Sequence, residues 1–481
     1  MTSSDLTTSA RSARPGDVTP GAAARAAAVP GVVAAPGIVA AVTGALPVVT
    51  TVTAVVVTRG RTPFLAHTLA ALRAQTTSPH EVVVVDAATG DASSEHQGLQ
   101  LGDARFVAAP RARSFGDAVD TALANVEPGT WLWLLHDDSA PAPDALAELL
   151  RAVEHSSAVA VAGPKQERWV PGTDAQLAAP FEPGTVSRLV EVGVTTTPLG
   201  RRLTGIDEDE VDQGQHDARE DVLAVGLAGA LVRRAVWQEL GGTDPELGPF
   251  GDGLDLCRRA RLAGHRVVVV PSAVVRHAQA SLLGLRERRR GTTALPAPDP
   301  DASSAARRHS QLHARLVGVA APWLPFVALA MVVGAPFHAA FRLLVKQPGQ
   351  ARDELLAPLW ALVRVGPVVR ARRVARRTRT LPRRALRPLR GTWREVLVER
   401  RDRRLARAEQ RRTAWAPTDI ERRELRALAV RRRAGLAGAA VVLAGFTAVV
   451  FGPLAGALLA RGRLGGGSVR QGSGRRGAAG R

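Results

Sequence analysis

The chain has 481 residues, of which 46% are apolar, so it is long enough for one large folded domain and additional segments. Its net charge of +20 lies in the C-terminal third, where residues 346–433 carry 27 basic and nine acidic side chains, and the rest of the chain is slightly acidic. Cys257 is the single cysteine, which excludes an intrachain disulfide and a cysteine-based zinc site and fits a reducing compartment.

Residues 1–50 are rich in Ala, Pro, Gly, Ser and Thr and predict a disordered leader. The apolar, uncharged stretch after Arg25 raises a signal peptide as the alternative. Pro30 and Pro36 interrupt this stretch, however, and it continues into an apparent strand. We therefore expect the first folded domain to begin at residue 51.

Apolar β-branched runs alternate with helical patterns after residue 51, which predicts an α/β domain with a mostly parallel sheet. Ligands bind such sheets beyond the carboxyl ends of the strands. Thr58, Asp86 and the pair Asp137-Asp138 each follow a strand directly, so they are the first candidates for a site. The expected strands are 51–57, 81–85, 106–107 and 131–135, and the expected helices are 63–75, 117–124 and 144–153.

The second half of this domain begins with an irregular region, 170–220. We interpret its acidic segment, Ile206–Asp212, as a loop on the acceptor side. Regular patterns return at residue 222, and we expect the domain to end near residue 285. The expected elements are helices 234–240 and 254–263 and a strand at 266–270.

Two long apolar stretches follow a basic linker, 286–315. Residues 316–341 and 434–460 contain 26 and 27 residues without Lys, Arg, Asp or Glu, and a membrane-spanning helix needs ~20. Because basic loops tend to stay cytoplasmic, we expect 316–345 to be interfacial or re-entrant and 434–460 to span the membrane. Two spanning helices with an external loop are the alternative.

The Arg-rich segment 346–433 would then be cytoplasmic and could lie on anionic lipid headgroups. The pI of ≈ 11.5 also suggests nucleic-acid binding as an alternative function. The segment lies between apolar stretches and lacks a zinc-finger or aromatic RNA-binding signature, so we expect no nucleic-acid partner. With a disordered tail at 461–481, the pattern predicts a cell-membrane protein whose N-terminal domain is cytoplasmic.

Two acidic positions at strand ends could bind a ligand. The pair Asp137-Asp138 could hold Mg²⁺ or Mn²⁺, which prefer oxygen ligands, or it could begin a turn. Asp86 could accept hydrogen bonds from a base or a ribose, or it could be an ordinary turn residue.

Two further positions could carry chemistry. Asp252 and Asp255 lie three residues apart at the start of a helix, where a carboxylate could cap the helix or act as a general base. His277 follows a strand, and its imidazole could be a metal ligand or a structural side chain.

The order of these features resembles family 2 glycosyltransferases of the GT-A fold over about 51–280. The resemblance is to a membrane-associated, actinobacterial type, and the Arg-rich, Lys-poor composition fits a GC-rich genome. The combination is specific for fold and class and much less so for the sugar. The matching segments are TAVVVTRG (53–60), VVVVDAATGDAS (82–93), PRARSFGDAVDTAL (110–123), WLWLLHDDSAPAPDAL (131–146) and the block 229–277.

The resemblance implies an inverting transfer from a nucleotide sugar to a lipid-linked or cell-envelope glycan acceptor. Asp138 and His277 would bind a divalent metal, Mn²⁺ or Mg²⁺. Asp252, or else Asp255, would be the catalytic base. The implied donor-binding residues are Thr58, Arg59, Asp86, Asp117 and Asp137.

Two departures from the family pattern put activity in question. His136 replaces the first acid of the Asp-x-Asp element, and Gly253 stands where the family has a second acid. A membrane scaffold that keeps the fold without catalysis is therefore the alternative.

Overall fold

The computed structural model describes residues 50–464, with gaps at 61, 89–101, 128, 155, 170–185, 198–199, 208, 287–297 and at several positions between 393 and 418. The chain divides into two units, 1–49 and 50–481. The expected leader, up to residue 49, and the expected tail, from residue 465, lie outside the described residues.

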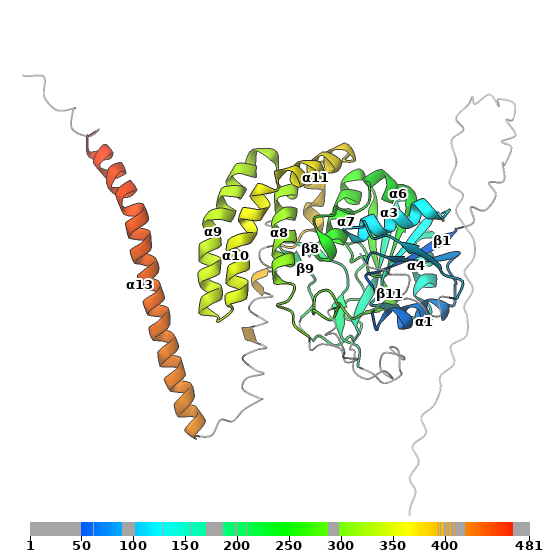
Figure 1. Cartoon of the computed structure of the whole chain (residues 1–481), viewed down its shortest axis with the longest axis horizontal. Coiled ribbons are helices and arrows are strands. Elements are labelled where there is room, and N and C mark those ends of the chain that lie inside the picture. Colours follow the sequence, from blue (N-terminus) through cyan, green and yellow to red (C-terminus); the bar gives the residue numbers. More distant parts are fainter. Residues whose placement is uncertain are drawn as a thin grey trace, which may run out of the picture. The chain divides into compact units, whose positions relative to one another are not determined.

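A nine-stranded sheet forms the centre of the second unit, with the order β3-β2-β1-β4-β10-β6-β11-β5 and with β7 paired to β6 (Figure 1). The first four strands of this order are parallel, as are β6 and β11, whereas β10 runs antiparallel between β4 and β6. This confirms the predicted mostly parallel α/β sheet. The strands are β1 Val52–Thr58, β2 Glu81–Asp86, β3 Arg105–Ala108, β4 Trp131–His136, β5 Ser139–Pro141, β6 Val159–Arg168, β7 Leu189–Glu191, β10 Ala230–Arg233 and β11 Arg266–His277, with a separate pair β8 Thr195–Thr196 and β9 Arg202–Leu203.

Helices cover both faces of the sheet, which explains why its strands read as continuous apolar runs. In α4 the apolar residues Leu146, Leu149 and Val153 recur at helical spacing and pack with α1 on one face. Helices α3, α6 and α7 pack on the other face, where Trp237 is fully buried. Figure 1 shows α1 and α3 on opposite sides of the strands. The helices are α1 Leu65–Arg73, α3 Phe115–Asn125, α4 Ala145–Glu154, α6 Arg234–Leu240 and α7 Asp252–Ala263, with a short 3₁₀ turn η1 Gly248–Phe250.

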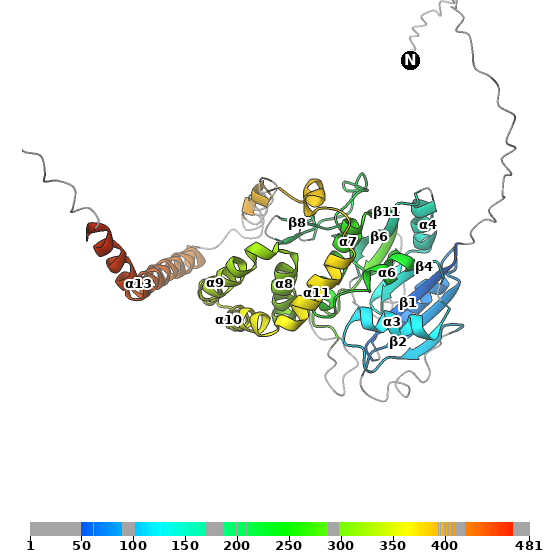
Figure 2. The same ribbon diagram turned by 90° about the horizontal axis from the view of Figure 1, so that it is seen from above.

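Four helices after the sheet pack side by side around an apolar cluster that includes Leu312, Met331, Ala357 and Val368 (Figure 2). The first of them, α8, begins in the segment 286–315 that we expected to be a basic linker and ends three residues beyond it. It contacts the sheet domain, because Ser310 Oγ donates to the carbonyl oxygen of Leu247. The helices are α8 Ser304–Gly318, α9 Leu324–Leu344, α10 Pro348–Val363 and α11 Val365–Arg377, with the short turns η2 Ala321–Trp323 and η3 Arg383–Leu389.

In the described part of the chain, one helix is long and apolar enough to cross a membrane, judged by length and composition alone. It covers Ala321–Leu344 with a mean hydropathy of 1.8, and 17% of its most apolar window is buried. The second apolar stretch, 434–460, belongs to helix α13, Asp419–Leu464.

Candidate active site

The carboxyl ends of β1, β2 and β4 bring together three residues predicted to bind the donor. Thr58 lies opposite Asp86 in the parallel register, and Thr58 Oγ1 lies 2.9 Å from Asp137 Oδ2. Asp86 Oδ1 accepts hydrogen bonds from the backbone N–H groups of Gly60 (2.9 Å) and Ala88 (2.8 Å). The buried polar groups therefore hold the turn after β1 in place.

Asp137 forms a two-pronged ion pair with Arg286. Nη1 of Arg286 lies 2.9 Å from Oδ2 and Nη2 lies 2.7 Å from Oδ1, and the Asp137 side chain is fully buried. Burial alone would lower the pKa of Arg286, but the charges of Asp137 and Asp138 raise it. Arg286 therefore stays protonated, and the ion pair joins this residue to the carboxyl end of β4.

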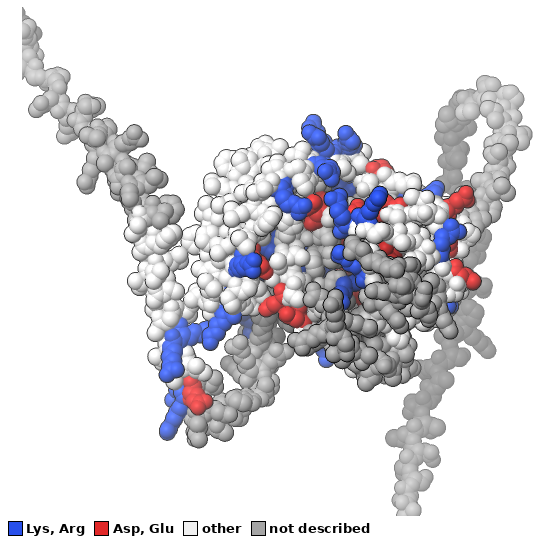
Figure 3. All heavy atoms as spheres, in the orientation of Figure 1, with Lys and Arg blue, Asp and Glu red and all other residues white. Residues whose placement is uncertain are grey.

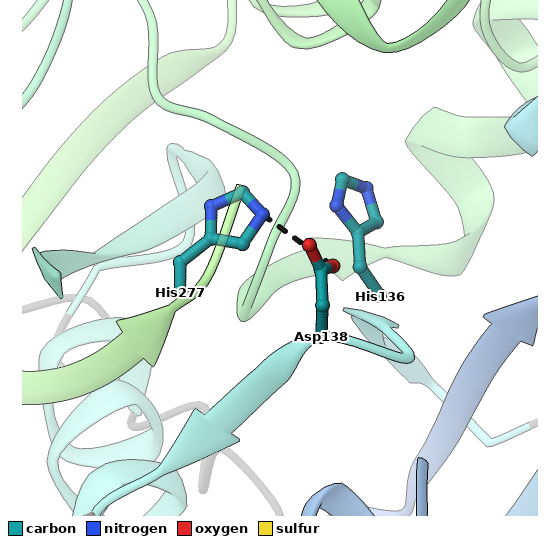
Figure 4. Close-up of side chains that lie close together, drawn as sticks. All are labelled: His136, Asp138 and His277. Atoms are coloured by element: carbon teal, nitrogen blue, oxygen red, sulfur yellow. Dashed lines mark ion pairs between the residues drawn. The ribbon is translucent and has the colours of Figure 1, made fainter. Parts of the chain in front are cut away.

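His136, Asp138 and His277 form a compact group whose possible ligand atoms all lie within 4.8 Å of one another (Figure 4). Strand β11 brings His277 to the other two residues, because it pairs with β5 so that His277 lies opposite Ser139. The side chains point toward a common space, with His277 Nε2 3.6 Å from Asp138 Oδ1.

The two oxygens of the Asp138 carboxylate have different surroundings. Oδ2 accepts a hydrogen bond from the backbone N–H of Ala280 at 2.6 Å. Oδ1 is buried and has no partner at hydrogen-bond distance, although His277 Nε2 and Arg286 Nη2 each lie 3.6 Å from it. Because buried carboxylate oxygens are rarely left unpaired, an orphaned oxygen between two imidazoles fits a cation site.

A second residue fixes the orientation of the His277 ring. Gln166 Nε2 donates to the carbonyl oxygen of Ala228 at 3.1 Å, so Gln166 Oε1 faces His277 Nδ1, also at 3.1 Å. In the neutral imidazole, Nδ1 then carries the proton and Nε2 presents its lone pair toward Asp138. This is the arrangement by which an outer residue orients a metal-binding histidine.

The charge states of this group also suit a cation. Burial, and next the neighbouring His277, lower the pKa of His136 to about 3, so its imidazole is neutral at physiological pH. Burial alone would raise the pKa of Asp138, but His277 in its positively charged form and the Arg286 guanidinium outweigh burial and lower that pKa below its ordinary value. The group therefore offers an ionised carboxylate beside a neutral imidazole.

A cavity of about 400 Å³ connects this group to the start of α7. His136, Asp138 and His277 line it together with Asp252 and Gly253. The cavity thus combines a possible cation site with a carboxylate from a different part of the fold, which is the requirement for transfer chemistry between two substrates.

Asp252 is the first residue of α7 and differs from Asp138 in its surroundings. Oδ1 accepts the backbone N–H of Gly253 at 2.7 Å, and Oδ2 is buried without a hydrogen-bond partner. Burial raises the pKa of Asp252 to about 7, and the neighbouring Asp255 charge contributes to the increase. A carboxylate with this pKa can accept a proton near neutral pH.

Asp255 has a structural environment instead. Its Oδ2 accepts a hydrogen bond from Arg259 Nε at 2.7 Å, and the same guanidinium donates to the carbonyl oxygens of Leu240 and Gly242, each at 2.7 Å. Burial alone would raise the pKa of Asp255, but Arg259 and Arg258 lower it. The two predicted base candidates are thus physically distinct.

Steric contacts explain why position 253 is a glycine. A Cβ atom there would lie 2.7 Å from the carbonyl oxygen of Val225 and 3.3 Å from the backbone nitrogen of Leu227. Backbone atoms cannot move aside as a flexible side chain can, so the close approach of the segment 225–227 to α7 requires glycine. The departure at this position therefore reflects local packing.

The profile of the family described as "Glycosyltransferase like family 2" matches residues 50–293, half of the chain. The chain belongs to this family of glycosyltransferases. No curated protein matches the chain.

Among solved structures, this glycosyltransferase is similar to GalNAc-T7 with UDP, GalNAc and Mn²⁺ (15% identity, TM-score 0.36, 47% of this chain and 44% of that chain). It is also similar to the mannosyltransferase PcManGT from Pyrobaculum calidifontis in complex with GDP-Man and Mn²⁺ (18%, 0.33, 68% and 84%). A third is glucosyl-3-phosphoglycerate synthase from Mycobacterium tuberculosis with phosphoglyceric acid (14%, 0.33, 55% and 80%). The chain spans less than half of the GalNAc-T7 chain.

None of the five residues predicted to bind the donor lines this cavity: Thr58, Asp86 and Asp137 lie at the strand ends beside it, and the other two lie elsewhere. Arg59 is exposed after β1. Asp117 lies in the first turn of α3 and accepts the backbone N–H of Arg113 at 3.1 Å.

Three residues of the candidate site were not predicted from the sequence. His136 was interpreted as a lost acid, although imidazole is itself a metal ligand. Gln166 and Arg286 had no signal, since one lies inside a strand and the other in an expected linker.

Proposed function

We propose that the chain is a metal-dependent, inverting glycosyltransferase that acts on a lipid-linked or cell-envelope glycan. The observation that carries this proposal is the shared cavity, which His136, Asp138 and His277 line together with Asp252. Both carboxylates have a buried oxygen without a hydrogen-bond partner. A scaffold has no use for two such costly groups facing one cavity.

On the donor side, Asp138 and His277 would hold the divalent metal, with His136 as a third ligand. A bound metal would stabilise the departing nucleoside diphosphate. We expect Mn²⁺ to serve better than Mg²⁺, because Mg²⁺ prefers oxygen ligands and this group offers two imidazole nitrogens. The proposed contacts to the rest of the donor are Thr58, Arg59, Asp86, Asp117 and Asp137.

On the acceptor side, Asp252 would be the catalytic base. Its carboxylate would accept the proton of the acceptor hydroxyl while that oxygen attacks the anomeric carbon and the bond to the nucleoside diphosphate breaks. In-line displacement inverts the configuration of that carbon. Asp255, which is paired with Arg259, would position α7 instead of taking the proton.

The apolar helices support a membrane location. We propose that 316–345 lies at the membrane interface, that 434–460 spans, and that the catalytic domain is cytoplasmic, where nucleotide sugars are available. The exposed Trp323, Phe326 and Phe341 on and before α9 support the interfacial part of this proposal.

The test is a screen of the full chain in detergent for thermal stabilisation by UDP-, GDP- and dTDP-linked sugars, with Mn²⁺, Mg²⁺ or EDTA. A ligand that binds the native state alone raises its apparent stability. We expect one donor class to raise the melting temperature with Mn²⁺ and not with EDTA. Asp138→Ala should abolish the increase, whereas the exposed Asp103→Ala should preserve it.

The stabilising donor is then used in a transfer assay with a membrane extract as acceptor source, and the anomeric configuration of the product is determined by NMR. Transfer with inversion supports the proposal. If the donor binds but is neither transferred nor hydrolysed in any extract, the result would favour the scaffold alternative. A product with retained anomeric configuration would exclude Asp252 as the base of a single displacement.

A further inference from the structure

A second cavity, of about 610 Å³, lies between α7, the end of α8, α11 and η3. Among the residues that the structure describes, its lining contains seven arginines and no acidic residue, and we call it the arginine cleft. The side chains of the remaining lining residues are apolar or small. The arginines are Arg258, Arg372, Arg373, Arg376, Arg379, Arg383 and Arg390.

Backbone carbonyl groups hold part of this charge in place. Arg372 Nη1 donates to the carbonyl oxygens of Leu316 (2.7 Å) and Val319 (2.8 Å) at the end of α8. The last carbonyl groups of a helix carry partial negative charge, so they stabilise a cation without neutralising it. Asp255 lies near the cleft, with its Oδ1 4.0 Å from Arg258 Nη2, but its Oδ2 forms an ion pair with Arg259.

The arrangement leaves donors and charge unsatisfied. The Nε atoms of Arg258 and Arg390 are buried and have no hydrogen-bond partner. Burial, and then the charges of Arg258 and Arg372, lower the pKa of Arg383. Like charges at this density repel one another unless an anion lies between them, so the cleft suits an anion.

We propose that the arginine cleft binds the phosphate group of an anionic membrane lipid. Guanidinium groups match phosphate oxygens with paired hydrogen bonds. Ala320 and Ala321 line the cleft, and the turn η2 leads from them into the apolar helix α9. Trp323 in η2 and Phe326 in α9 are each 63% exposed. A phosphate in the cleft would therefore place its acyl chains at the beginning of an apolar surface.

The surface around the cleft agrees with this assignment. Figure 3 shows basic side chains gathered over α11 and next to it, beside the largely uncharged surface of α9 and α10. No aromatic side chain of the described residues lines the cleft, so this part of the chain gives it no stacking surface of the kind found in single-stranded nucleic-acid sites. Continuity with an apolar helix is instead the pattern of a lipid headgroup site.

The experiment compares two triple variants of the full chain that remove the same charge from the same segment. The cleft variant is Arg376→Gln, Arg379→Gln, Arg383→Gln, which changes three lining residues.

The control variant is Arg370→Gln, Arg377→Gln, Arg384→Gln, which changes three exposed residues outside the lining. Both variants are compared with the native sequence by circular dichroism and by donor-induced thermal stabilisation, so that a failure to fold is recognised.

Binding is measured by co-flotation with vesicles of phosphatidylcholine alone and of phosphatidylcholine with 20 mol% phosphatidylglycerol. We expect the anionic lipid to strengthen binding, and the cleft variant to lose about tenfold or more of this gain, because charge-assisted hydrogen bonds are lost with the charge. The control variant should lose much less. Equal losses in the two variants would show general charge attraction and overturn the proposal.

Two further probes separate lipid from other anions. Glycerol phosphate at matched phosphate concentration should not displace the chain from anionic vesicles. Displacement by glycerol phosphate would assign the cleft to a soluble phosphate. Tighter binding of a fluorescent single-stranded oligonucleotide than of vesicles, lost only in the cleft variant, would assign the cleft to nucleic acid. Both outcomes overturn the lipid assignment, and neither depends on sugar transfer.

Discussion

At the scale of single residues, the environment of Asp252 gives the sharpest prediction. If it is the base, Asp252→Asn should lower the turnover number about 10²–10⁴-fold, with the donor-induced thermal shift unchanged. Native activity should rise with pH through about 7, where Asp252 loses its proton. A loss of donor binding in the variant, or a pH-independent rate between pH 5.5 and 8.5, would contradict this role.

Asp252→Asn should lower activity but raise the stability of the folded chain at alkaline pH. Its pKa in the folded state is raised above the ordinary value of 3.8 to about 7, so the folded chain binds this proton more tightly than the unfolded chain. Its contribution to the free energy of unfolding is therefore lost as pH rises from about 4 to about 7. Asp252→Asn removes this cost, so the variant should melt at a higher temperature than the native chain at pH 8, with a smaller difference at pH 5. A variant that is less stable at pH 8 would contradict the burial argument.

Gly253 predicts a steric effect that its neighbour does not share. Gly253→Ala should reduce the free energy of unfolding by about 1–3 kcal/mol, because the new Cβ meets the backbone of Val225. Gly251→Ala is the control, since its Cβ would have an ordinary contact of 3.5 Å with Leu247 Cδ2. Thermal melts of both variants at pH 7 make the comparison, and equal losses would refute the steric explanation.

Individual site residues were only partly predictable from the sequence. Asp138 and Asp86 follow obvious strands, so their position at the carboxyl edge of the sheet could be inferred. The partnership of Asp138 with His277 depends on β5, a three-residue strand that ends in a proline and carries no strand signal of its own. Arg286 reaches Asp137 from a segment without periodicity, and no local pattern predicts such a pair.

At the scale of elements, α7 is anchored by Arg259, which joins Asp255 to the turn after α6. Arg259→Leu should reduce the free energy of unfolding by about 3–5 kcal/mol, because it leaves a buried carboxylate unpaired. Arg266→Leu, which removes a partly exposed arginine 3.5 Å from Glu220, should cost less than about 1 kcal/mol. Thermal denaturation distinguishes the two, and similar losses would show that the buried pair has no special role.

The elements of the sheet domain were predictable because β-branched runs and helical spacing coincide with burial. The antiparallel β10 could not be placed, since its four residues read like any other apolar run. After residue 303, the sequence predicted apolar helices at 316–345 and 434–460, where α9 and part of α13 lie, but it did not predict α8, α10 and α11. Their sequence is dominated by arginine and apolar residues, and only their packing around Met331 and Ala357 shows which faces are internal.

At the scale of the whole molecule, the exposed apolar side chains of α9 predict how the chain meets a membrane. Replacing Phe326, Phe337 and Phe341 by Ser should weaken binding to phosphatidylcholine vesicles several-fold, because each loses its transfer free energy into the bilayer. Donor-induced stabilisation should not change. Undiminished vesicle binding would show that α9 does not enter the membrane, and 434–460 would then carry the attachment.

Helix α7 touches both cavities: Asp252 at its first residue lines the proposed reaction site, and Arg258 and Leu262 line the arginine cleft. Two ligands that bind one rigid element are linked thermodynamically, and such linkage is reciprocal. If lipid phosphate in the cleft tightens donor affinity by some factor, the nucleotide sugar must tighten lipid affinity by the same factor. A catalyst built in this way would keep its catalytic domain against the bilayer surface for longer when its sugar supply is plentiful, so cellular metabolism would set how tightly that domain is held there.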